Sequence, residues 1–160
     1  MEKCFKQLKA HLKGKVVILG IGNSLKSDDG AGPFLAKRIK DKHNFLVFDA
    51  GTCPENYLGK VIKEKPDTVV IIDAADFGGT PGELRIIEAE QLKSVNLFST
   101  HNASISLTAN YLQSNLKVDI IILIIQPKTI LLGEQFSPEV TKSLSILEDW
   151  FSQFAINLSP

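Results

Sequence analysis

Aspartates and one histidine are concentrated in a few short polar segments of this chain. Asp28 and Asp29 lie in GIGNSLKSDDGAG, Asp49 begins DAGTCPEN, Asp73 begins DAADFGG, and His101 lies in STHN. Carboxylates that lie close together repel one another, and a divalent cation offsets that repulsion and keeps them ionised. Aspartate and histidine suit zinc, nickel and related ions, and three protein ligands leave positions open for water or substrate. The segments therefore predict a metal site that binds water or substrate, rather than a purely structural one.

Apolar runs bounded by turn residues mark the strands that must position these segments. We predict four strands, over Val16–Leu19, Phe45–Phe48, Thr68–Ile72 and Ile120–Ile125. Because the runs are apolar on both sides, they are typical of a parallel sheet that helices cover on both faces. Residues 82–88, GELRIIE, alternate polar with apolar side chains after a Gly-Gly-Thr-Pro turn, which indicates an added antiparallel edge strand.

Segments with helical spacing lie between and around these strands. Apolar spacing predicts helices around residues 34–39, 57–62 and 105–112, an amphipathic leader helix in residues 1–15, and a last helix from Pro138 to about Asn157. The predicted fold is a single three-layer α/β/α domain over residues 1–160, with a mostly parallel twisted sheet of about five strands. Open parallel sheets bind ligands at the carboxyl ends of their strands. We therefore expect the aspartates and His101 to converge on one crevice.

Gly20 and Gly22 also fit a dinucleotide-binding pattern. In that pattern Asp49, at the end of the second predicted strand, would bind the ribose of the dinucleotide. That pattern needs a third glycine at position 25, which is occupied by Leu25. Asp28 and Asp29 stand where a pyrophosphate would meet the positive end of a helix, and they would repel it. We therefore expect the glycines to turn the chain.

Each acidic or histidine side chain also has a purely structural interpretation. Asp28 or Asp29 could cap the following helix, Asp73 could bond backbone amides in a turn, and His101 could be a polar residue at a helix terminus. We favour the cap for Asp28 and the metal ligand for Asp29. The positive end of a helix dipole would favour the neutral imidazole that a metal requires at His101.

Composition excludes two further classes of function. The 18 lysines and arginines balance the 18 aspartates and glutamates, and no basic run occurs, so the footprint of a nucleic-acid binder is missing. The longest apolar run, residues 118–125, is too short to span a bilayer, and the N-terminus lacks the apolar stretch of a signal peptide. We expect a soluble, cytoplasmic protein without membrane insertion.

With these residues assembled, the sequence resembles the hydrogenase maturation endopeptidases, which process the large subunit of NiFe hydrogenases. GIGNSLKSDDGAGP, DAGTCPEN, VVIIDAADFGGTPGELRII and THNASISL occur in the order and at the approximate spacing of that family. The similarity runs from the first strand to the final helix. The later segment IIQPKTILLGEQFSP is similar to the branch that serves formate-hydrogenlyase-type or energy-converting hydrogenases.

The resemblance implies that Asp29, Asp73 and His101 bind the nickel already inserted in the large-subunit precursor, which is the partner of this protein. The implied reaction hydrolyses the peptide bond just beyond the precursor's last nickel-binding cysteine motif and releases a short C-terminal peptide. Either the metal or an uncoordinated carboxylate, Asp49 or Asp28, would activate the water, so Asp49 joins the three ligands as a candidate catalytic residue. The other hypothesis is a nickel-dependent checkpoint module that inspects the same precursor without cutting it. The oligomeric state stays open.

Overall fold

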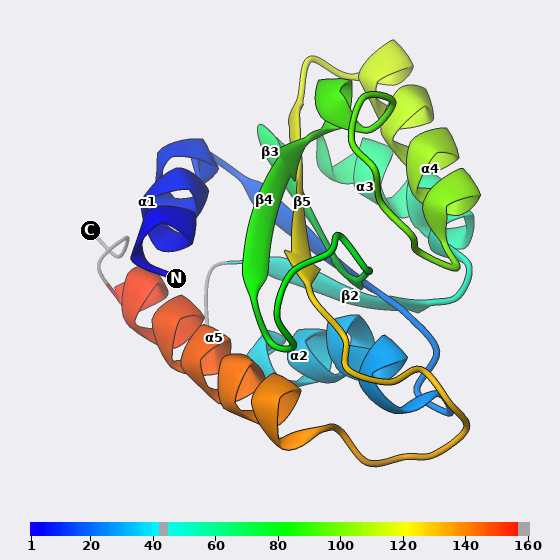
Figure 1. Cartoon of the computed structure of the whole chain (residues 1–160). Coiled ribbons are helices and arrows are strands. Elements are labelled where there is room, and N and C mark those ends of the chain that lie inside the picture. The colour runs from blue at the N-terminus through cyan, green and yellow to red at the C-terminus, as the bar shows by residue number, and fades with distance from the viewer. Residues whose placement is uncertain (42–44, 157–160) are drawn as a thin grey trace.

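A computed structural model describes residues 1–41 and 45–156 (Figure 1). Among these residues, five strands form one sheet in the order β2-β1-β3-β5-β4. Their bounds are Val16–Ile21 (β1), Leu46–Gly51 (β2), Thr68–Ala74 (β3), Leu84–Glu88 (β4) and Asp119–Ile125 (β5). All neighbouring strands are parallel except β4, which runs antiparallel to β5 at the edge. The predicted mixed sheet is confirmed, but β3 is longer than predicted and includes Asp73.

Helices cover both faces of the sheet (Figure 1). They are α1 (Glu2–His11), α2 (Ala31–Ile39), α3 (Leu58–Glu64), α4 (Asn102–Asn115) and α5 (Pro138–Ile156), with the short 3-10 turns η1 (Ser27–Gly30), η2 (Pro54–Tyr57) and η3 (Ala89–Gln91). Helices α1, α2 and α5 pack on one face, and α3 and α4 pack on the other. The predicted three layers are confirmed, whereas the predicted end of the last helix, Asn157, lies outside the described residues. In the described part of the chain, none of the helices combines the length and apolar character that crossing a membrane requires.

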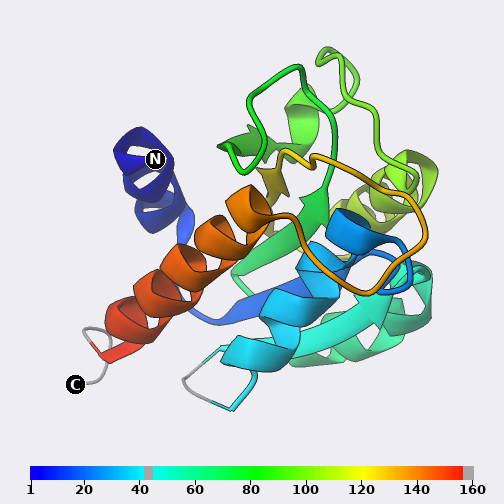
Figure 2. The same cartoon turned by 60° about the horizontal axis from the view of Figure 1, so that its bottom comes forward.

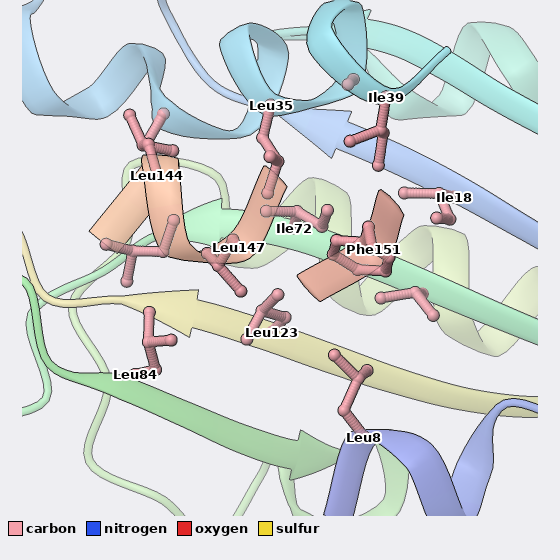
Figure 3. Packing of buried hydrophobic residues seen from close by; sticks show 14 of the residues in the cluster. Leu8, Ile18, Leu35, Ile39, Ile72, Leu84, Leu123, Leu144, Leu147 and Phe151 are labelled. Carbon is pink, nitrogen blue, oxygen red and sulfur yellow. The ribbon is translucent and has the colours of Figure 1, made fainter. Parts of the chain in front are cut away.

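Helix α5 contributes much of the core on its face of the sheet. Leu144, Leu147 and Phe151 are buried and recur at helical spacing, so they form one apolar stripe. Figure 3 shows this stripe pointing toward Ile72 of β3 and Leu123 of β5. The helix thereby fixes the position of the segment that precedes it, which borders the site described below.

The first turn of α2 lies directly against β1 because glycines leave no side chain between the two elements. A Cβ at Gly32 would lie 2.3 Å from the carbonyl oxygen of Ile21 and 2.4 Å from that of Ile72. A Cβ at Gly20 would lie 2.3 Å from the carbonyl oxygen of Gly32. Of Gly20 and Gly22, only Gly22 has a positive φ, at 152°. The expectation that both turn the chain is therefore wrong for Gly20, which makes room for α2.

We expect Gly32→Ala to lower the free energy of unfolding by about 1–3 kcal/mol, because backbone atoms would have to move to accept the methyl group. Gly59→Ala in α3 is the matched control, since a Cβ there meets no described atom within 4 Å. Helix propensity predicts that the control gains up to about 1 kcal/mol. Urea denaturation measures both changes, and a Gly32→Ala protein as stable as the wild type would contradict the close approach.

Candidate functional site

The carboxyl ends of β1 and β3 form the topological switch point of the sheet. From β1 the chain continues to β2 on one side, and from β3 it continues to β4 and β5 on the other side. A crevice opens at such a point because the two connections leave in opposite directions. Asp29 lies at this crevice in η1, which follows the loop after β1. Asp73 lies there as the next-to-last residue of β3.

Asp29, Asp73 and His101 form one buried group at this crevice. Each residue offers one ligand atom, and these atoms all lie within 4.8 Å of one another. The Nε2 atom of His101 lies 3.3 Å from Oδ2 of Asp29. The structure therefore brings together three of the four residues that the sequence nominated as catalytic, with a donor set that suits a divalent cation.

Asp49 is directed away from this group. Its carboxylate lies 3.5 Å from the Nζ atom of Lys37 on α2 and accepts a hydrogen bond from the N–H of Gly51 at 3.1 Å. Side chains alternate along a strand, and Val47, two residues earlier, packs on the α2 face of the sheet. Asp73 shares the opposite, α4 face with Ile71. Because side chains alternate between the two faces along β2 and β3, Asp49 and Asp73 lie on opposite faces of the sheet.

Asp28 anchors the segment that leads from β5 into α5. It is completely buried, and its carboxylate accepts the N–H groups of Lys128, Thr129 and Ser137 at 2.9, 3.2 and 2.7 Å. The hydroxyl of Ser137 donates a fourth hydrogen bond at 2.9 Å. The prediction that Asp28 caps the next helix is therefore wrong: α2 begins at Ala31 without a capping bond from a described side chain. The donors come from far along the chain, where no local capping pattern reveals them.

Ser99, which the sequence analysis missed, holds Asp73 and His101 in place. Its hydroxyl donates to Oδ2 of Asp73 at 2.5 Å and accepts the backbone N–H of His101 at 3.0 Å. Two backbone hydrogen bonds of 2.9 Å between Asp76 and Phe98 tie this segment to the end of β3. His101 then stands at the N-cap position of α4. Its place before a helix was predicted, but its link to Asp73 through Ser99 was not.

Burial and charge shift the proton affinities of the group. Burial raises the pKa of Asp73 to about 7, against hydrogen bonding from Ser99 and the charge of His101. The hydrogen bond with Asp29 raises the pKa of His101 despite its burial, and the charge of Asp73 adds to the increase. In the metal-free group the neighbouring carboxylates therefore oppose the expected effect of the helix dipole on His101. The Oδ1 atom of Asp73 is buried without a hydrogen-bond partner among the described residues, as suits an atom that binds a cation.

A cavity of about 440 Å³ opens beside the group, and Asp29 is the member that lines it. The other walls come from residues 98–100 and Asn102 on one side and from residues 127–130 on the other. Figure 2 shows the segment between β5 and α5 passing beside the beginning of α2, where η1 carries Asp29. A substrate in the cavity therefore reaches the group from the side of Asp29.

Comparison with known proteins identifies the family. A family model described as hydrogenase maturation protease matches residues 33–150. The chain is 41% identical over 116 residues to the hydrogenase 3 maturation protease of Escherichia coli K12, which covers 69% of this chain and 72% of that protein. The chain belongs to the hydrogenase maturation protease family. The predicted family is thus confirmed, and the matched residues include Asp73 and His101 but begin just after Asp29.

Solved hydrogenase maturation proteases share the fold of this chain. The NiFe hydrogenase maturation protease HycI of Thermococcus kodakarensis superposes with a TM-score of 0.84 at 32% identity, over 94% of this chain and 99% of that chain. The endopeptidase HycI of Escherichia coli superposes with a TM-score of 0.78 at 29% identity, over 88% and 91% of the two chains. The protease fold therefore extends over nearly the whole chain, including the switch point.

The raised pKa of Asp73 makes the stability of this family member depend on pH. Folding raises this pKa from its ordinary value of 3.8 to about 7, so stability falls as pH rises through this range, and the full penalty remains above it. Asp73→Asn removes the penalty. We expect the variant to unfold with a free energy about 2 kcal/mol higher than the wild type at about pH 8, and with little difference near pH 4. Metal-free urea titrations at both pH values measure this, and a variant less stable at pH 8 would contradict the assignment.

Metal binding should compete with protons at the same group. A metal requires an ionised Asp73 and a neutral His101, whereas burial raises the pKa of Asp73 to about 7 and the hydrogen bond with Asp29 raises the pKa of His101. We therefore expect the affinity for Zn²⁺ or Ni²⁺ to rise between about pH 6 and pH 8, with release of protons on binding. Calorimetric titrations in buffers of different ionisation enthalpy measure both quantities. An affinity that does not change with pH would rule out these two residues as joint ligands.

Proposed function

We propose that this chain is the endopeptidase that removes the C-terminal extension from the nickel-loaded precursor of a NiFe hydrogenase large subunit. The observation that carries the proposal is the buried group of Asp29, Asp73 and His101 beside a cavity, in a member of the hydrogenase maturation protease family. Residues 124–138 favour the branch that serves formate-hydrogenlyase-type or energy-converting hydrogenases. We also propose that the reaction takes place in the cytoplasm.

The group gives a physical reason for selecting a loaded precursor. Two buried carboxylates repel each other, and Oδ1 of Asp73 has no described hydrogen-bond partner. In the proposed complex the precursor brings its nickel to the cavity, where an oxygen of Asp29, Oδ1 of Asp73 and Nε2 of His101 complete the coordination. A precursor without nickel would form no coordination bonds with these three side chains, so its complex would lack this stabilisation.

Positioning of the scissile bond is the main contribution of the three ligands, because coordination fixes the precursor relative to the protease. Nickel held by these residues would polarise the carbonyl group or lower the pKa of the attacking water. Neither Asp28 nor Asp49, the two candidate general bases, is placed for that role. Asp28 uses its carboxylate for four hydrogen bonds, and Asp49 pairs with Lys37 on the other face of the sheet. These placements support a metal-assisted mechanism.

A cleavage assay tests the proposal. The protein is mixed with the nickel-loaded precursor or with its nickel-free form, and the precursor mass is followed by mass spectrometry. We expect a C-terminal peptide to be released only from the loaded form. His101→Ala or Asp29→Ala should reduce the rate by about a hundredfold or more, because the scissile bond is no longer held in place.

Two variants serve as controls in this assay. His11→Ala makes the same substitution at a histidine that contacts Asp119 and Glu88, at the opposite ends of the strands from the cavity. Asp49→Asn removes the carboxylate that pairs with Lys37. Both variants should retain wild-type cleavage. Equal cleavage of the nickel-free precursor would contradict the selection by nickel, and binding of the loaded precursor without cleavage would contradict the protease itself.

A further inference from the structure

Large apolar side chains are gathered and exposed around the mouth of the cavity. Leu25, Phe98, Leu131 and Leu132 are the four most exposed large apolar residues among those that the structure describes, with Leu131 at 76% and Leu132 at 84%. Ile130 is also exposed. We call these five residues the apolar rim. Surfaces of this kind mark sites of interaction when they are contiguous, because exposed apolar area is costly to keep in water.

Backbone hydrogen bonds connect the parts of the rim that are distant in sequence. The N–H of Gly133 donates to the carbonyl oxygen of Leu25 at 2.9 Å, and the N–H of Ser27 donates to the carbonyl oxygen of Gly133 at 2.6 Å. The hydroxyl of Ser27 donates to the carbonyl oxygen of Leu131 at 2.8 Å. Leu25 and residues 130–132 therefore lie on two loops that are bonded to each other.

The same loops hold the rim in a fixed position. The four hydrogen bonds of the Asp28 carboxylate secure residues 128 and 129 and the start of α5, and the N–H of Asp28 donates to the carbonyl oxygen of Thr129 at 3.2 Å. The leucines are thus exposed on an anchored scaffold. An anchored apolar surface binds a partner with less loss of conformational entropy than a loose loop does.

The rim is continuous with the proposed active site. Ile130 and Phe98 belong to the rim and also line the cavity that contains Asp29. A polypeptide that fills this cavity therefore contacts rim residues. The rim side chains carry no charge, and the neighbouring Lys128 has its ammonium group 2.7 Å from Glu139. The chemistry of the surface accordingly favours apolar side chains over charged ones.

We propose that the apolar rim binds apolar side chains of the precursor's C-terminal extension and holds that segment extended during cleavage. This inference rests on the proposed function. The extension is present in the substrate and absent from the mature subunit, so affinity for this segment favours substrate binding without retaining the mature subunit. The group of Asp29, Asp73 and His101 would then recognise the nickel, and the rim would recognise the segment to be removed.

The test compares a double variant, Leu131→Ser with Leu132→Ser, with the control Tyr111→Ser. Tyr111 is an exposed apolar residue on α4 that does not line the cavity. Each full-length protein is titrated with the nickel-loaded precursor and with the mature subunit that lacks the extension, and KM and kcat are measured for cleavage. All three side chains are exposed, so folding should be unaffected, and thermal unfolding checks this.

We expect the double variant to bind the precursor at least about tenfold more weakly and to show a similar increase in KM, because two leucines no longer become buried. Its kcat and its affinity for the mature subunit should match those of the wild type and of Tyr111→Ser. Unchanged binding of the precursor would overturn the inference, and so would an equal loss of affinity for the mature subunit. A wild-type dimer that the double variant cannot form would also overturn it, because a second copy would then cover the rim.

These outcomes are distinct from a failure of the proposed function. If the wild type binds the precursor but does not cut it, the proposed protease activity is wrong. The titrations would still decide whether the rim binds the extension. A wild type that neither binds nor cuts the precursor would overturn both.

Discussion

Two carboxylates are buried within reach of each other at the switch point of the sheet, and the cost of burying their charge sets the requirements for everything around them. Burial raises the pKa of Asp73 to about 7, and the hydrogen bond with Asp29 and the charge of Asp73 raise the pKa of His101. The hydroxyl of Ser99 satisfies one oxygen of Asp73 and leaves the other without a described partner. The arrangement is unfavourable for an empty site and favourable for one that receives a cation, which is the property that a sensor of nickel needs.

The fold makes this arrangement possible because the strands that carry it are apolar on both faces and rigidly packed. β1 and β3 are completely buried, and α5 presses its apolar stripe onto the same region of the sheet. Gly20 and Gly32 let α2 approach β1 closely, so that η1 begins at the strand ends. A strained electrostatic group can persist in such a place since the surrounding packing supplies the stability that the group itself does not.

Sequence patterns predicted the elements and the convergence of Asp29, Asp73 and His101, because the ends of parallel strands necessarily meet at one edge. They did not predict the function of Asp28, whose partners lie 100 to 109 residues further along the chain. Asp49 followed a strand run just as Asp73 did, and only the alternation of side chains within each strand separates their faces. Ser99 escaped notice because a serine in a polar turn carries no pattern that distinguishes it from its neighbours. Contacts between distant segments, rather than local propensity, account for what was missed.

Asp28 and Asp29 are adjacent in the chain, yet one secures the loop that bears the leucines and the other belongs to the buried acid and histidine group. The two tasks are therefore built into a single 3-10 turn, η1. An insertion or deletion in residues 128–137 would pull on this turn and displace Asp29. Side chains on the outer loop can therefore vary at constant loop length without disturbing Asp29, whereas a replacement of the whole loop has to supply its own donors to the carboxylate of Asp28.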